Sequence, residues 1–110
     1  MVNNYQELLQ RYLSSPRRPG YPLPGITCAD GFTMSVQASS FTYCSPRNDV
    51  GPWVEVEVGY PSTPEPMLFE YAETPGHWTD TVYPYTPVAV VANIIEVHGG
   101  FKEEVGVVTP

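Results

Sequence analysis

Positively charged side chains are scarce in this sequence. Its 110 residues include five Lys and Arg residues against twelve Asp and Glu residues, which gives a formal net charge of −7 and a pI of about 4.5. Nucleic acids and anionic membranes are themselves densely negative, so direct binding to either is disfavoured. A basic protein is the partner that such a charge favours.

Long apolar runs are also missing. The longest apolar stretch, Val88–Val97, is interrupted by Asn93 and Glu96 and is far shorter than the roughly 20 residues that cross a bilayer. The first residues lack the basic segment and apolar run of a secretory signal. The sequence therefore predicts a protein that neither spans a membrane nor is secreted.

Metal-binding and nucleophilic side chains are few. The two cysteines and two histidines could in principle hold zinc, but zinc ligands usually come in closely spaced pairs and these four stand far apart in the chain. They are Cys28, Cys44, His77 and His98. No nucleophile elbow, phosphate-binding loop, dinucleotide fingerprint or calcium loop occurs. We therefore predict no metal site, no cofactor and no catalytic residue, and two reduced cysteines.

The remaining composition is that of a small folded domain. Hydrophobic residues make up 42% of the chain and charged residues 15%, and 13 prolines and 9 glycines predict short elements joined by stiff loops. We expect one domain over residues 1–100 and a tail over 101–110 that is frayed or forms an edge strand. The proline-rich residues 16–25 are expected to run extended, although they could also serve as a ligand for an aromatic groove.

Two helices are predicted from apolar spacing and end signals. The first follows an N-cap at Asn3 or Asn4, and its apolar positions repeat as on one helical face. The second has Thr86 as N-cap, Pro87 at its first position and Gly99 just past its end. A short third helix over residues 65–73 would be capped by Thr63. The apolar positions of the first helix are Tyr5, Leu8, Leu9, Tyr12 and Leu13, and those of the second are Val88, Val91, Ile94 or Ile95, and His98.

Strands are predicted from alternating apolar residues. Residues 26–29 and 32–38 form a hairpin around Asp30–Gly31, because Asp-Gly suits a tight turn. Residues 41–44 form a third strand and residues 53–60 a fourth, whereas residues 74–84 are irregular. In the fourth, Val54, Val56, Val58 and Tyr60 share one face and Glu55 and Glu57 the other. The fold class is therefore α+β, with a mainly antiparallel sheet of about four strands packed against two or three helices.

The negative charge is concentrated in the second part of the chain. Residues 1–47 carry a net charge of +2, whereas residues 48–110 carry −9. This distribution is either a solvated surface that keeps the protein in solution or a face that binds a basic partner. The Glu55 and Glu57 pair could alternatively protect a sheet edge from aggregation. The acidic candidates for partner contact are Glu55, Glu57, Glu65, Glu70, Glu73 and Asp80.

Two tryptophans extend this candidate set. Trp53 and Trp78 stand near proline-rich segments, where large aromatic side chains commonly anchor protein interfaces. Aromatic residues in such segments equally often cover a small core as a lid. The sequence leaves both interpretations open.

Three segments resemble one family of proteins. YQELLQRYLSSPRRPGYPLPGITCADGFTMSVQASSFTYCSPR, GPWVEVEVGYPS and VYPYTPVAVVANIIEVHGG together cover about residues 4–100. They are similar to small accessory proteins encoded by bacteriophages and prophages. The resemblance implies action in the bacterial host cytoplasm, and it supplies no catalytic motif. Proteins of this kind are often inhibitors of host defence systems, including anti-CRISPR proteins.

The sequence thus favours a non-enzymatic inhibitor that occludes a bacterial defence protein through an acidic face. Electrostatic complementarity makes this plausible, because defence proteins that handle nucleic acid have Lys- and Arg-rich channels. Two alternatives remain: a small enzyme or ligand-binding protein that acts on a host metabolite or defence signal, and a virion assembly factor.

Overall fold

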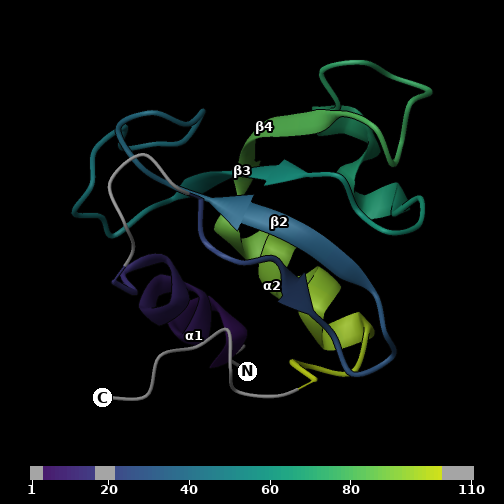
Figure 1. The fold of residues 1–110 in the computed structure, drawn as a ribbon, viewed down its shortest axis with the longest axis horizontal. Coiled ribbons are helices and arrows are strands. Elements are labelled where there is room, and N and C mark those ends of the chain that lie inside the picture. The colour runs from purple at the N-terminus through teal and green to yellow at the C-terminus, as the bar shows by residue number, and fades with distance from the viewer. Residues whose placement is uncertain (1–3, 17–21, 103–110) are drawn as a thin grey trace.

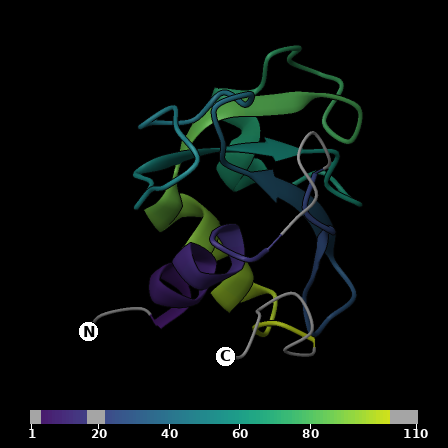
Figure 2. The ribbon, with the colours of Figure 1, turned by 60° about the vertical axis from the view of Figure 1, so that its left-hand side comes forward.

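The computed structural model describes residues 4–16 and 22–102. Its elements, in chain order, are the helix α1 (Asn4–Leu13), strands β1 (Ile26–Thr27), β2 (Thr33–Gln37) and β3 (Glu55–Gly59), the 3₁₀ helix η1 (Pro66–Tyr71), strand β4 (Val82–Pro87) and the helix α2 (Val88–Val97). The strands form one antiparallel sheet in the order β1-β2-β3-β4. In Figure 1, α2 passes behind β2, and α1 lies beside α2 in both ribbon views (Figures 1 and 2). The predicted α+β fold is confirmed.

The helix α1 forms as its apolar spacing predicts. Leu9, Tyr12 and Leu13 are buried, and Tyr5 and Leu8 pack against the edge of the same core. This stripe lies against α2, whose predicted inner residues Val88, Val91, Ile94 and Ile95 are also buried. The two helices therefore pack together through their apolar sides, and α2 lies behind β2 in Figure 1. The prediction was wrong for His98, which follows the helix and is only half-buried.

The predicted hairpin is confirmed. Ile26 pairs with Met34 in an antiparallel register, and the turn contains Asp30 and Gly31. Gly31 has a φ of 95°, a backbone conformation that glycine adopts without a steric penalty. Met34 and Val36 are buried, as the alternation of apolar residues predicts.

The third strand was predicted in the wrong place. Residues 41–44 form turns, and β4 supplies the remaining strand of the sheet. The sequence pattern disfavours a strand at β4 because it contains Pro84 and Pro87. However, β4 is an edge strand, where a missing backbone N–H does not interrupt a second ladder of hydrogen bonds.

The predicted strand over residues 53–60 is shorter in the structure. Val56 and Val58 are buried, whereas Val54 and Tyr60 are exposed because they lie outside β3. The backbone leaves the pleat at Tyr60, whose φ is 50°. Since β3 lies between β2 and β4, its glutamates do not protect a sheet edge, and that alternative was wrong.

The ends of the later helices differ slightly from the prediction. The helix expected over residues 65–73 is the shorter η1, and its cap is Glu65 instead of Thr63. The helix α2 follows β4 directly, and its N-cap is Pro87 instead of the predicted Thr86. The Thr86 hydroxyl donates to the Tyr83 carbonyl, and no side chain caps the first turn of α2.

The structure describes only part of the predicted tail, of the proline-rich connector and of the start of the first helix. Phe101 forms an isolated β-bridge with Cys28, and the Lys102 amide donates to the Thr27 carbonyl. The start of the predicted tail therefore lies beside β1. Residues 103–110 of that tail, residues 17–21 of the proline-rich connector and Asn3 lie outside the described residues.

Candidate functional site

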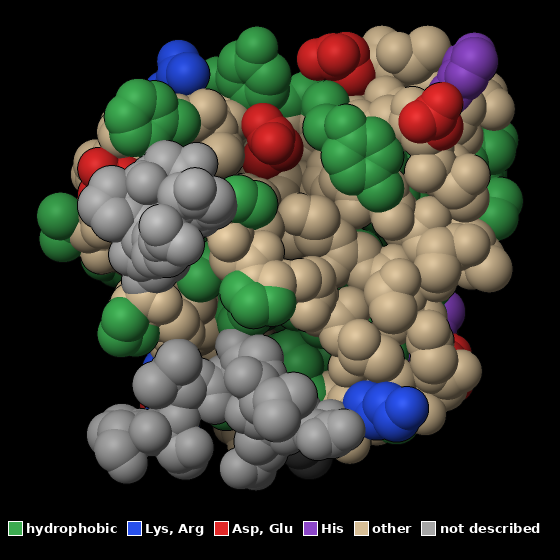
Figure 3. All heavy atoms as spheres, in the orientation of Figure 1, with side chains coloured by type: hydrophobic (Ala, Val, Ile, Leu, Met, Phe, Trp, Pro, Cys, Tyr) green, Lys and Arg blue, Asp and Glu red, His purple; other side chains and the backbone are tan. Residues whose placement is uncertain are grey.

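The acidic residues predicted to form one face lie in separate places. Glu55 and Glu57 lie on β3, whereas Glu70, Glu73 and Asp80 are exposed on η1 and the segment that leads to β4. Glu55 and Glu57 are the first and third residues of β3, whereas η1 and the segment that follows it lie beyond the last residue of that strand, on the right of the sheet in Figure 1. Figure 3 shows Asp and Glu side chains (red) separated by hydrophobic and uncharged surface on that side of the molecule. The acidic residues therefore do not form one continuous patch there.

Two of the predicted contact residues are buried. Trp53 is 2% exposed and Glu65 is 6% exposed, so neither presents a surface to a partner. Trp53 is held in the core by Gln10, whose amide donates to the Trp53 carbonyl at 2.6 Å and accepts from its backbone N–H at 3.0 Å. The prediction of Trp53 as an interface anchor was wrong. The side-chain amide of Gln10, 43 residues away in the sequence, bonds to the Trp53 backbone and holds this residue in the core.

Trp78 covers part of the molecule instead of extending from it. Its ring stacks on Phe69 with centroids 3.9 Å apart and planes at 16°, and it is half-buried. This contact joins the segment before β4 to η1. Trp78 therefore lies as a lid residue would, covering Phe69, and not as an anchor that extends freely from the surface.

A different set of exposed side chains belongs to the 39–54 loop and the adjoining strand β4. Five large hydrophobic residues of the 39–54 loop and β4 are between 43% and 82% exposed. We call this set the apolar surface. Its members are Phe41, Tyr43, Val50, Val54 and Tyr85.

Backbone contacts connect the parts of the apolar surface. The Tyr85 amide donates to the Tyr43 carbonyl at 3.1 Å, and the Val54 amide donates to the Ser45 carbonyl at 2.8 Å. The Val54 carbonyl accepts from the amide of Val88, the first residue of α2. Backbone hydrogen bonds therefore join the 39–54 loop, β4 and the start of α2 at the residues that carry the apolar surface.

Polar side chains of the 39–54 loop fix its shape from within. Asp49 accepts hydrogen bonds from the amide and hydroxyl of Ser40 at 2.8 and 3.0 Å. Asn48 Oδ1 accepts from the amides of Val50 and Gly51, and its carbonyl accepts from the Trp53 indole. These hydrogen bonds within the loop fix its backbone. The exposed side chains of Phe41 and Val50 therefore extend from a loop of defined shape.

Sequence reasoning missed the apolar surface because it placed residues 41–44 in a strand with a buried face. A usable signal was present in Ser39, Ser40, Asn48 and Asp49, since Ser, Asn and Asp bond to nearby backbone and favour turns over strands. Such a segment has no inner face for Phe41 or Val50 to occupy.

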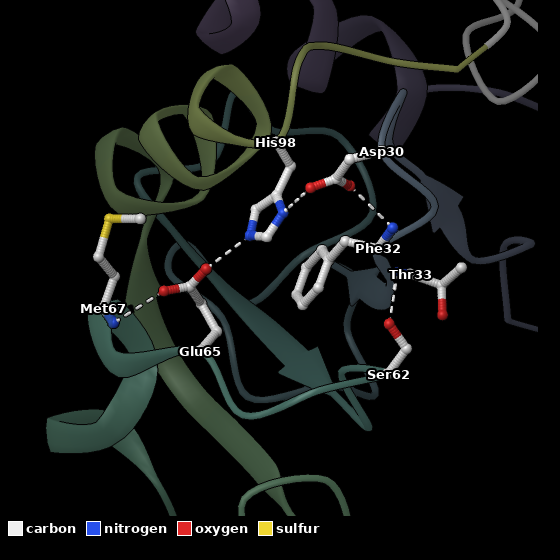
Figure 4. A network of polar contacts seen from close by, with 7 residues as sticks. All are labelled: Asp30, Phe32, Thr33, Ser62, Glu65, Met67 and His98. Atoms are coloured by element: carbon white, nitrogen blue, oxygen red, sulfur yellow. Dashed lines mark hydrogen bonds and ion pairs between the residues drawn. The ribbon is translucent and has the colours of Figure 1, made fainter.

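A polar junction joins three segments at the other end of α2 (Figure 4). His98, which follows α2, lies between two carboxylates: Nδ1 is 2.6 Å from Asp30 Oδ2 and Nε2 is 2.7 Å from Glu65 Oε1. The Phe32 ring stacks on the imidazole with centroids 4.1 Å apart. Asp30 also accepts from the Phe32 amide, and Glu65 from the Met67 amide. We call these three residues, His98, Asp30 and Glu65, the His98 junction.

Two carboxylate partners can both be bonded only by a protonated ring, because a neutral imidazole has only one N–H to donate. Desolvation alone would lower the pKa of His98, but hydrogen bonds to Glu65 and Asp30 and their charges raise it above its usual value of 6.5. The Phe32 amide and His98 lower the pKa of Asp30. With both nitrogens engaged, His98 has no free nitrogen to accept a proton from a substrate.

The cysteines are free and buried. Burial, with the charge of Asp30, raises the pKa of Cys28 to about 11, so its thiolate is scarce near neutral pH. The Cys44 thiol donates to the Ser39 carbonyl at 3.1 Å and helps to close the 39–54 loop. Within residues 4–16 and 22–102, no three His, Cys, Asp or Glu residues are grouped so that they could hold a metal ion.

No protein-family model, curated protein or solved structure matches the chain. None of the helices in the described part of the chain is long and apolar enough to cross a membrane.

Proposed function

We propose that this protein is a non-enzymatic binding protein that engages a basic protein through the apolar surface. The observation that carries this proposal is the exposure of Phe41 and Val50, at 82% and 80%, on a loop whose polar groups are bonded internally. Aromatic and aliphatic side chains on a preformed surface bind with little loss of conformational entropy. Aromatic residues such as phenylalanine and tyrosine are also enriched at protein interfaces.

The charge around the apolar surface supports a basic partner. Glu55 and Glu57 lie beside it on β3, and the chain as a whole carries −7. A partner with exposed Lys or Arg would be attracted toward this end of the sheet and then held by apolar contact. The resemblance to small phage-encoded proteins directs this proposal to bacterial defence proteins, including CRISPR effectors, as the class to be occluded in the host cytoplasm.

A paired-variant experiment tests the proposal. Phe41→Ser combined with Val50→Ser removes the most exposed part of the apolar surface, whereas Val97→Ser removes an apolar side chain that is 69% exposed at the far end of α2. Tagged wild type and variants are used to capture proteins from a bacterial lysate. The same forms are expressed in a strain with an active CRISPR system, and phage plating is counted.

The expected result is one basic defence protein that is retained by the wild type and Val97→Ser and lost by the double variant. Phage plating should rise with the same two forms only. Equal capture by all forms would contradict the proposal, as would a partner that is acidic. A melting temperature raised by a nucleotide, with no protein partner, would favour the ligand-binding alternative, and co-purification with phage particles would favour the assembly factor.

A further inference from the structure

The most specific geometry within the apolar surface is its tyrosine pair. The rings of Tyr43 and Tyr85 have centroids 6.1 Å apart and planes at 44°, and both are partly exposed. The hydrogen bond from the Tyr85 amide to the Tyr43 carbonyl fixes one residue relative to the other. Tyr85 has a φ of 52°, which is uncommon for a bulky residue and is retained chiefly where the surrounding structure requires it.

Negative charge lies next to this pair. Glu57 Oε2 accepts from the Tyr43 amide at 3.0 Å, and Glu55 lies on the same face of β3. Both glutamates are half-buried. The salt bridges found in the described part of the chain all involve His98, so neither glutamate has a cationic partner there.

The ring of Tyr43 already attracts a cation from its own chain. The guanidinium carbon of Arg47 is 5.7 Å from the Tyr43 ring centroid, within the range of a cation–π contact. Arg47 is exposed and belongs to the same loop. The contact shows that the electrostatics at this ring suit a positively charged side chain.

We propose that Tyr43 and Tyr85, with Glu55 and Glu57 beside them, form a subsite for one cationic side chain of the partner, and that Arg47 competes with it. This inference rests on the proposed function and gives the chemistry of one contact in it. Aromatic faces and carboxylates both favour a guanidinium or ammonium group over a neutral chain of similar length. Phe41 and Val50 would supply the apolar part of the same interface.

The test uses three blocked tripeptides in which glycine flanks arginine, lysine or norleucine. Binding to the isotope-labelled protein is followed by the chemical shifts of the tyrosine rings. We expect saturable shifts at Tyr43 and Tyr85 with the arginine and lysine peptides and none with norleucine. Tyr85→Leu should weaken binding roughly two- to fivefold, the range of an exposed cation–π contact, and Tyr85→Phe should preserve it. Glu57→Gln should weaken binding by up to about fivefold, the range of an exposed ion pair.

Two further variants separate the subsite from general effects of charge and folding. Tyr60→Leu is the matched control, because Tyr60 is an exposed tyrosine with a φ of 50° just beyond the far end of β3. It should bind the peptides as the wild type does. Arg47→Gln should bind the cationic peptides more tightly, since it removes the competing cation; weaker binding by this variant would overturn the proposal, as would equal binding of the norleucine peptide.

The outcome also distinguishes the subsite from the proposed function. If no peptide binds while partner capture still depends on Phe41 and Val50, the subsite is overturned and the proposed function stands. If the cationic peptides bind as expected but no form captures a protein, the subsite stands and the proposed function is overturned.

Discussion

The His98 junction should make the free energy of unfolding depend on pH in a defined direction. The pKa of His98 is raised in the folded protein, so its contribution is complete below the unfolded value of about 6.5 and is lost as pH rises through the higher folded value. The pKa of Asp30 is lowered, so its contribution is present above 3.8 and is lost as pH falls through its folded value. Between 3.8 and 6.5 both contributions are present.

The variant His98→Gln gives this effect a magnitude. Glutamine is neutral and offers one amide group, whereas the protonated ring donates to two carboxylates, one of them on the buried Glu65. The glutamine amide can take the place of only one of the two ring nitrogens, so the variant loses one hydrogen bond to a charged group, which contributes about 1.5–3 kcal/mol near pH 6. At about 4 °C per kcal/mol for a domain of this size, the melting temperature should fall by about 6–12 °C.

Thermal unfolding between pH 5.5 and 9 measures the effect. The melting temperature of the wild type should fall as pH rises above 6.5, and that of His98→Gln should vary less, so that the two curves approach each other. His77→Gln is the matched control, because His77 is the other histidine and is exposed. Parallel curves for wild type and His98→Gln, or the same loss in His77→Gln, would refute the reasoning.

Two other predictions concern the support of Trp53. Gly51→Ala should destabilise the protein more than Gly76→Ala. Both glycines have positive φ, but of the two only Gly51 would place its new Cβ 2.7 Å from the Trp53 ring. Urea unfolding measures the free energy of unfolding of both variants, and equal losses would contradict the structure. Gln10→Ala should cost about 1–3 kcal/mol, since it leaves the Trp53 backbone unpaired in a largely buried position, whereas Gln6→Ala on the exposed face of α1 should change the free energy of unfolding little.

The parts of the fold that the sequence predicted correctly depend on local pattern. The apolar stripe of α1 and the alternation around Asp30–Gly31 are complete within a few residues, so spacing alone locates them. The strand β4 depends on its place in the sheet, because Pro84 is tolerated at an edge and would not be in the centre. The spacing of residues in the sequence does not indicate whether a strand will lie at the edge or in the centre of a sheet.

The candidate sites were harder to predict because their contacts are distant in the chain. Glu65 was predicted at the surface from its charge, but His98, 33 residues away, pairs with it and makes its burial tolerable. Trp53 was predicted as an anchor from its size, but Gln10 is 43 residues away and satisfies its backbone in the interior. The charge of Glu65 and the size of Trp53 indicate which contacts these side chains can make. Whether they are exposed depends on their bonds to His98 and Gln10, which sequence spacing does not reveal.

The His98 junction and the apolar surface lie at opposite ends of α2. The Val54 carbonyl accepts from the amide of Val88 at the start of the helix, and His98 follows its last residue. Ten residues at 1.5 Å each separate them by about 15 Å. We therefore expect loss of the His98 proton to weaken its contacts with Asp30 and Glu65, which lie in the hairpin turn and before η1, away from the loop that carries Phe41. It follows that His98→Gln, at a temperature where it remains folded, should bind the partner as the wild type does, so stability and binding can be altered separately in this protein.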